Sequence, residues 1–430
     1  MTTGNFSRHF VYSRLQTTSI ILYSIFKNEA AAQPLNHLLS SRINYEICIS
    51  HLSTMKKILS VFIATASGIA AAIYLSGYGY IFKAAALNLK KGPIAPSIDD
   101  EEKFPSRPVP NLYAEPWKKN TAYNTKFLPE NILKELKKTQ ASSLVIIRDN
   151  EIFHEQYWKD HQPSSLMNSF SMAKGILCLL VGCAIDDGYL KSEDQLLSTL
   201  FPSYKNSRYG QFLTIRHLMT MQAGLDWKEE YHHPFAENSK QYFIEDLAEQ
   251  AFGVEVKEMP GQTYKYQSAA PQLLGLALRK ATGKDLASYL SEKIWIPLGM
   301  EFPAKWSTDE KGIEKAFCCI HATPRDFAKI GQLMMQNGKW KGKQLISKKF
   351  CEKLLTPTKA NDAFCFSVWA DDESELKCRF LYGFLGQFII MVPEKNIVIV
   401  KTGFYNRLDV DKKQRPVQVK MMIEEIIGML

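Results

Sequence analysis

The chain has 430 residues, of which 46% are hydrophobic and 23% charged, so it can bury a large core and is neither disordered nor collagen-like. The net charge of +9 could suggest nucleic-acid binding, but the basic residues are scattered and no RNA-recognition, zinc-finger or basic-zipper pattern accompanies them. We therefore expect no nucleic-acid partner and read the basicity as solubility, with some attraction to an anionic membrane surface.

An apolar run from residue 58 to residue 82 contains no ionisable side chain except tyrosines. Its length reaches the ~20 residues that a membrane-spanning helix needs. Lys56 and Lys57 precede the run and favour a cytoplasmic amino terminus, although further lysines follow it. The run exceeds the usual ~7–15-residue core of a signal peptide, so we expect an uncleaved anchor over residues 55–83, with a cleaved signal peptide as the alternative.

The anchor divides the chain into parts of different character. Because Met55 begins an ordinary anchor sequence, we expect residues 1–54 to be an unstructured extension. Residues 84–127 are rich in Pro and Lys without a sustained period, which predicts a linker. A compact domain is expected over residues 128–430.

Within this domain the hydrophobic pattern predicts strands near both ends and mostly helices between them. The expected elements are a helix over 128–140, a hairpin over 142–158 turning at Asp149–Asn150, a hairpin over 384–404 turning at 393–396, and a helix over 415–429. Strands this far apart in the chain can share one antiparallel sheet. The predicted fold class is therefore α+β, an antiparallel sheet flanked by helices plus a mostly helical subdomain, with the site between the two.

Ser-x-x-Lys by itself is a weak signal, since it occurs four times here. Only Ser171–Lys174 opens a long apolar segment, which predicts a helix ending at 186–188. Between His161 and Asp186, Lys174 is the sole strongly ionisable side chain. A helix that is apolar on every side is buried, and a buried ammonium must find a partner or lose its proton. The pattern predicts a lysine of lowered pKa, which is usable as a general base.

Residues three apart share a helix face, so the Lys174 amine can reach Ser171 Oγ. Backbone N–H groups and the dipole at a helix start also favour an oxyanion. One helical turn would thus supply nucleophile, base and anion site. From the residues alone, roughly equal weight falls on the alternative that Ser171 caps the helix and Lys174 extends to the surface.

The segments around this pair resemble, in chain order, those of the serine β-lactamase and penicillin-binding-protein family, most closely its class C and esterase branches. The similar segments are 170–202, 213–227, 260–300, 322–347 and 382–400, within roughly residues 130–400. The resemblance implies that Ser171 is acylated and that Lys174 assists as base. Tyr266 matches the tyrosine of the family's Tyr-x-Asn motif and would pass the proton to the leaving group, which a tyrosine can do if a lysine ammonium lowers its pKa.

Two motifs depart from the usual family pattern. Ser268 stands where the second motif has Asn, and Phe-Leu-Gly at 384–386 replaces Lys-Thr-Gly or His-x-Gly. The second change removes the usual charge partner of a β-lactam carboxylate. Both resemble the 6-aminohexanoate-dimer hydrolase branch, which hydrolyses amides and carboxylic esters. This resemblance implies an oxyanion hole from the backbone N–H groups of Ser171 and Gln387, with Ser268, Phe384 and Gly386 binding substrate.

The predicted function is a serine hydrolase that forms an acyl-enzyme on Ser171 and cleaves a small carboxylic ester or amide. The alternatives are a D-alanyl carboxypeptidase or penicillin-binding protein, and an inactive envelope binding protein of the same fold. No metal or organic cofactor is expected. The expected location is the inner membrane, crossed once through residues 58–82, with the catalytic domain periplasmic or extracytoplasmic. The substrate and the oligomeric state stay open.

Other polar residues and the cysteines carry weaker signals. His217 and His321 are predicted to be structural, and Asp226 and Trp227 are candidates for the cleft wall. None of the eight cysteines forms a Cys-x-x-Cys pair, which leaves zinc and redox motifs without support. A Cys365–Cys378 bridge is conceivable outside the cytosol, and the sequence leaves it open.

Overall fold

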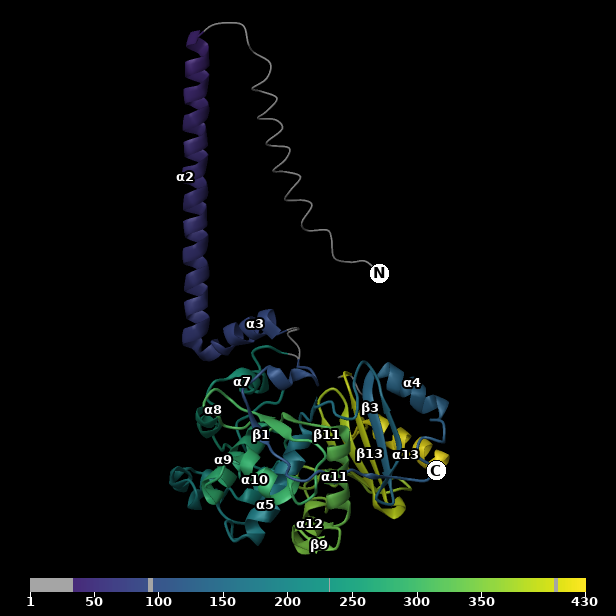
Figure 1. Ribbon diagram of the computed structural model, residues 1–430. Helices are drawn as coiled ribbons and strands as arrows, with labels where there is room; N and C mark the ends of the chain where they lie inside the picture. Colours follow the sequence, from purple (N-terminus) through teal and green to yellow (C-terminus); the bar gives the residue numbers. More distant parts are fainter. Residues whose placement is uncertain (1–33, 92–95, 232, 406–408) are drawn as a thin grey trace. The chain divides into compact units, whose positions relative to one another are not determined.

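The computed structural model describes residues 34–91, 96–231, 233–405 and 409–430 (Figure 1). The chain divides into two compact units, Met1–Ser76 and Gly77–Leu430, which are taken separately below. Predictions that concern residues 1–33 lie outside the described residues.

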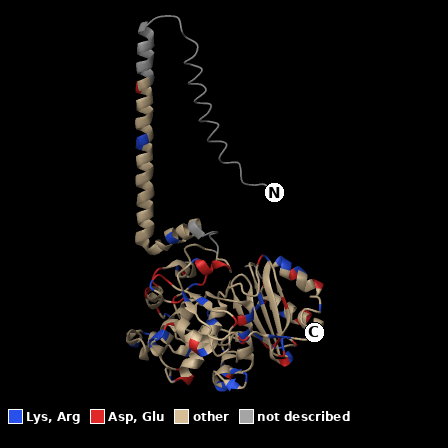
Figure 2. Cartoon of the chain, in the orientation of Figure 1, with Lys and Arg blue, Asp and Glu red and all other residues tan. Residues whose placement is uncertain are grey.

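The first unit contains one long helix, α2, over Pro34–Ile73. In the described part of the chain, one helical stretch, Tyr45–Tyr78, is long and apolar enough to cross a membrane. Most of this stretch is uncharged, as Figure 2 shows. The prediction that residues 1–54 are unstructured is wrong for residues 34–54, because they continue the same helix, and helix extension from an existing turn costs little.

The apolar run predicted as one helix up to residue 82 is interrupted at Gly77. This glycine has φ +82°, a left-handed conformation that residues with a Cβ rarely adopt. The next helix, α3, covers Tyr80–Lys91 and packs on α7, Glu237–Phe243. The candidate span therefore ends at Tyr78, and the last residues of the predicted anchor belong to the second unit.

The predicted linker over residues 84–127 is also wrong, because most of this segment is part of the folded domain. Strand β1, Ser106–Val109, pairs antiparallel with β6, Ala304–Ser307, and β2, Lys118–Lys119, pairs parallel with β4. Ile98 and Val109 are fully buried. Strands of two to four residues at sheet edges are too short to show a hydrophobic period, so composition alone suggested a linker.

The centre of the second unit is a seven-stranded sheet in the order β10-β11-β12-β13-β3-β4-β2, antiparallel except at β2. Both predicted hairpins are confirmed within it. Asp149 and Asn150 have φ of +51° and +66°, as a two-residue hairpin turn requires. The strands are β3 Ala141–Arg148, β4 Glu151–Tyr157, β10 Trp369–Asp371, β11 Cys378–Gly383, β12 Gln387–Val392 and β13 Ile397–Gly403.

Helices cover both faces of this sheet, as Figure 1 shows. Helix α11, Pro324–Met335, packs on β12, β13 and β3, while the terminal helices α4, Glu130–Lys138, and α13, Val417–Met429, pack together on the other side. Two small sheets complete the strands: β1-β6-β7-β5, with β7 Ile320–Ala322 and β5 Met167–Asn168, and β8-β9, Lys339–Trp340 with Lys343–Gln344.

A mostly helical region lies beside the large sheet, and α5 connects the two. Helix α5, Met172–Asp186, contacts β11 and β12 on one side and α9 on the other. Every residue of α5 from Met172 to Ala184 is buried, which confirms the prediction made from its apolar sequence. The other helices are α6 Ile215–Met219, α8 Leu247–Gly253, α9 Ala269–Thr282, α10 Leu286–Leu290 and α12 Lys348–Leu354. The predicted α+β class is confirmed.

Candidate active site

Ser171 lies immediately before α5, at the end of the segment that leaves β5. Phe170 has φ +44°, an uncommon conformation for a bulky residue, and its N–H donates to Asn168 Oδ1 at 2.8 Å. Among the described residues, no backbone N–H of α5 is capped by the Ser171 side chain. Its Oγ lies instead 2.8 Å from Lys174 Nζ. The alternative of a capping serine with a surface lysine is therefore wrong in both parts.

Lys174 is 2% exposed, and its amine has two oxygen partners. Besides Ser171 Oγ, Nζ donates to the backbone carbonyl of Phe317 at 2.8 Å. Burial lowers the pKa of Lys174 to about 8, although the Glu229 carboxylate opposes this effect. The amine is thus deprotonated in about half of the molecules at pH 8 and in about a tenth at pH 7.

Tyr266 comes from the segment before α9 and lies with its ring centroid 5.1 Å from Lys174 Nζ. Burial raises its pKa well above the ordinary value, and a hydrogen bond with Ser171 acts in the opposite direction. The condition stated above, a tyrosine pKa lowered by a lysine ammonium, is therefore not met. Tyr266 keeps its proton, and the structure brings it together with Ser171 and Lys174.

Ser268, at the start of α9, is engaged by a carboxylate that the sequence did not single out. Glu229 accepts from Ser268 Oγ at 2.6 Å and from the Ser268 backbone N–H at 2.9 Å. It also accepts from Trp227 Nε1 and from the Tyr231 hydroxyl, each at 2.7 Å. Four donors satisfy the carboxylate, so Glu229 fixes this wall of the site.

Neither of the two cleft candidates, Asp226 and Trp227, lines the cavity that opens at Ser171. Trp227 is buried and supports Glu229, whereas Asp226 forms a half-exposed ion pair with Lys257 at 2.7 Å. The acidic side chain at the cleft is therefore Glu229. A Trp-Lys-Glu-Glu run in a polar loop has no periodicity, so no signal in the sequence separated these acids.

The connection from β11 to β12 holds the altered third motif. The Phe384 ring stacks on Tyr231, with ring centroids 5.7 Å apart. The Gly386 carbonyl accepts from the buried Lys401 amine at 3.1 Å. The Gln387 side chain donates to the Phe384 and Gly403 carbonyls at 3.1 and 2.7 Å, and the residue is fully buried.

One cavity of about 480 Å³, within the usual range for small-molecule sites, opens at Ser171. Ser268 and Phe384 line it together with Ser171 and Lys174, while Tyr266, Gly386 and Gln387 do not belong to its lining.

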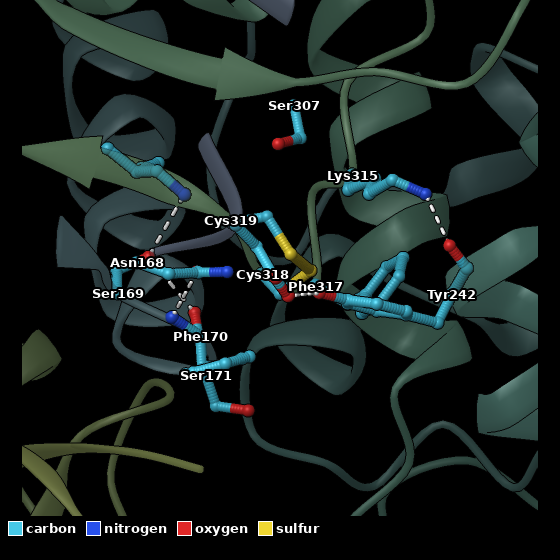
Figure 3. Close-up of a disulfide and its surroundings, with 12 residues drawn as sticks. Asn168, Ser169, Phe170, Ser171, Tyr242, Ser307, Lys315, Phe317, Cys318 and Cys319 are labelled. Carbon is cyan, nitrogen blue, oxygen red and sulfur yellow. Dashed lines mark hydrogen bonds between the residues drawn. A yellow bond between two sulfur atoms is a disulfide. The ribbon is translucent and has the colours of Figure 1, made fainter. Parts of the chain in front are cut away.

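A disulfide joins the adjacent residues Cys318 and Cys319, and Figure 3 shows it together with Phe317 and Ser171. Cys318 follows Phe317, whose carbonyl holds Lys174, and lines the cavity itself. In the described part of the chain, Cys365 and Cys378 are both free, so the bridge left open between them is not formed.

The two histidines predicted to be structural have structural partners. His217 Nδ1 accepts the Thr214 N–H at the start of α6, and buried His321 pairs with Ser307 Oγ at 2.9 Å. Both predictions are confirmed.

Gly383, the last residue of β11, packs directly on the segment that leads to Ser171. A Cβ at this position would lie 2.3 Å from the Ser169 backbone oxygen. Gly383→Ala should therefore destabilise the domain by about 1–3 kcal/mol, measured by urea unfolding. The matched control is Gly253→Ala in α8, where a Cβ meets nothing within 4 Å. Equal stability of the two variants would contradict this packing.

A mixed α+β domain with a buried Ser-x-x-Lys helix between its sheet and its helical region defines the β-lactamase-like class of folds. The β-lactamase family profile matches residues 130–415, and the chain belongs to this family. The family resemblance is thereby confirmed, and with it a relationship to hydrolases.

Two relatives are similar to this chain in sequence. A 6-aminohexanoate-dimer hydrolase from Paenarthrobacter ureafaciens is 25% identical over 260 residues, which cover 58% of this chain and 65% of that protein, slightly less than two thirds of its length. A protein from Alkalihalophilus pseudofirmus of uncharacterised function is 24% identical over 296 residues, 62% of this chain and 84% of its own.

Solved structures agree on the fold. One is a Bacillus anthracis protein with the proposed name 6-aminohexanoate-dimer hydrolase, which superposes with a TM-score of 0.66 at 20% identity. The superposition covers 77% of this chain and 92% of the B. anthracis chain. A penicillin-binding-protein homologue from Caulobacter crescentus gives a TM-score of 0.53 at 14% identity. This superposition covers 71% of this chain and 99% of the C. crescentus chain.

Proposed function

We propose that this member of the β-lactamase family is a serine hydrolase that forms an acyl-enzyme on Ser171 and cleaves a carboxylic ester or amide. The observation that carries the proposal is the 2.8 Å contact between Ser171 Oγ and a buried lysine whose pKa is lowered to about 8. A nucleophile in hydrogen-bond contact with a partly deprotonated base is the arrangement that activates a serine.

In the acylation step Ser171 Oγ attacks the substrate carbonyl carbon, and its proton passes to Lys174 Nζ. Tyr266, which holds its own proton, donates it to the oxygen or nitrogen of the leaving group and is reprotonated from Lys174. The bond from the carbonyl carbon to the leaving group breaks, and an ester of Ser171 remains. Water then attacks this ester and gives a proton to Lys174 Nζ. The bond between the carbonyl carbon and Ser171 Oγ breaks, Lys174 returns the proton to Oγ, and the acid is released. Backbone N–H groups of Ser171 and Gln387 are the proposed oxyanion donors.

The cavity supports an ester or uncharged amide rather than a β-lactam. Phe384 occupies the wall where the usual family motif supplies a basic residue, and the buried Lys401 amine nearby is engaged by the Gly386 carbonyl. A carboxylate bound there would also lie in the same cavity as Glu229, a repulsive arrangement. These contacts favour hydrolysis of esters and amides over D-alanyl carboxypeptidase activity.

The apolar stretch Tyr45–Tyr78 supports a membrane anchor. We propose a single-pass protein of the inner membrane whose catalytic domain faces the periplasm or the outside, as Lys56 and Lys57 before the apolar run favour.

Intact-mass spectrometry of the full chain tests the function. The protein is incubated separately with p-nitrophenyl acetate, a fluorophosphonate, an anilide and a penicillin. We expect acetyl and phosphonyl adducts that map to the peptide containing Ser171 and are absent from Ser171→Ala. Penicillin labelling as strong as fluorophosphonate labelling would favour the carboxypeptidase instead. No adduct from any probe, with equal ester hydrolysis by wild type and Ser171→Ala, would overturn the proposal in favour of an inactive binding protein.

A further inference from the structure

The cavity at Ser171 has an unusual wall, because part of it comes from α3, outside the segment that the family profile matches. Tyr80, Ile81, Ala84 and Ala85 of α3 line the cavity. The family match begins at residue 130, so this wall lies outside the segment that the profile matches.

Helix α3 is attached to the domain by specific contacts. The Tyr80 hydroxyl donates to the Pro234 carbonyl at 2.8 Å, and Lys83 forms an ion pair with Glu310 at 2.6 Å. Ile81 and Ala84, three residues apart, share one helix face. The small Ala84 side chain therefore leaves room beside the cavity that a larger residue would fill.

The cavity away from Ser171 is apolar. Its walls include Ile81, Phe170, Phe243, Phe384 and Leu385. Lys and Glu side chains in the described lining are limited to Lys174 and Glu229, and both are engaged by the partners described above. The lining also contains the polar residues His233, Asn238 and Ser239. Their side chains already pair with backbone groups of Phe235, Glu230 and His233, respectively. The cavity therefore offers a ligand mainly hydrocarbon contact, which favours an uncharged chain.

We propose that the site takes esters or amides that carry an unbranched hydrocarbon chain of about six or more carbons, held along the α3 wall. This inference rests on the proposed function and specifies its substrate class. In the sequence, a single residue separates the end of the candidate membrane span at Tyr78 from the start of α3 at Tyr80. Substrates with such chains partition into lipid, which suits an enzyme whose sequence also carries a candidate membrane span.

The test is a chain-length series with the full chain in lipid nanodiscs. One arm lengthens the acyl part, from p-nitrophenyl acetate through butyrate to octanoate, and the other lengthens the alcohol part of acetate esters. Complete burial of one methylene can raise affinity about fourfold. We expect kcat/KM for p-nitrophenyl octanoate to exceed that for the acetate by about 30-fold. If the chain binds on the alcohol side, we expect the same rise in kcat/KM along the acetate esters of longer alcohols instead.

Two tryptophan variants on α3 localise the effect. Ala84→Trp fills the wall and should lower the octanoate-to-acetate ratio of kcat/KM at least about fivefold. Ala86→Trp makes the same change at an exposed position outside the lining and should leave the ratio within about twofold of wild type. Ile81→Trp serves in place of Ala84→Trp if that variant does not accumulate.

A flat or falling wild-type series in both arms, with Ser171-dependent turnover of the acetate, would overturn this inference and leave the proposed function standing. Equal ratios in wild type and the Ala84→Trp and Ile81→Trp variants would overturn the placement along α3. Loss of the proposed function would show differently, as the absence of any Ser171 adduct.

Discussion

Replacing Lys174 with methionine should lower the rate of Ser171 acylation about a hundredfold to ten-thousandfold, the usual contribution of a positioned general base. Lys174 Nζ contacts Ser171 Oγ at 2.8 Å, and burial holds its pKa near 8. Methionine is unbranched and of similar length, so it can fill the space in α5 without supplying a base. The measurement is the stopped-flow burst of p-nitrophenol together with the adduct mass.

Lys315→Met is the matched control for this variant. Lys315 is also fully buried with a lowered pKa, but its amine donates to the Tyr242 carbonyl at 2.6 Å. Its removal should change the acylation rate less than about threefold. The base assignment fails if Lys174→Met retains a rate within tenfold of wild type, or if Lys315→Met loses as much.

The sequence predicted the centre of this site because its signals are local. Ser171 and Lys174 are three residues apart in a helix that has no other charge, and burial of that helix follows from its composition. The hairpin turning at Asp149–Asn150 was likewise encoded by two turn residues between hydrophobic runs.

The residues that were missed depend on tertiary structure. The second oxygen partner of Lys174 is the Phe317 backbone carbonyl, 143 residues away, and a carbonyl has no sequence signature. Glu229 differs from the other acids of its loop because the tertiary structure brings its carboxylate to Ser268, and the sequence alone does not show this contact. Helix α3 continues an apolar run, and a single glycine conformation at Gly77 separates it from the span.

Activity should rise steeply with pH up to about 8. Below this value the Lys174 amine is protonated in most molecules, so kcat/KM should approach a tenfold fall per pH unit and drop about fiftyfold between pH 8 and pH 6. Tyr266 keeps its proton throughout this range because burial raises its pKa well above the ordinary value. A profile that is flat from pH 6 to pH 9 after correction for spontaneous hydrolysis would contradict a lysine base.

The same pKa makes a separate prediction for stability, which does not depend on turnover. The pKa of Lys174 is lowered from 10.5 to about 8 by folding, so between these values the unfolded chain binds a proton that the folded chain does not. Stability of wild type relative to Lys174→Met should therefore rise with pH across this window, by about 3 kcal/mol in total, and stay constant below pH 8. Any pH-independent packing difference between the variants cancels in this comparison, as does titration of the other groups. Urea unfolding of both proteins from pH 7 to pH 10.5 measures the change. If the free energies of unfolding of the two proteins vary with pH in parallel, the Lys174 amine keeps its proton in the folded protein. The proposed mechanism would then lack its base.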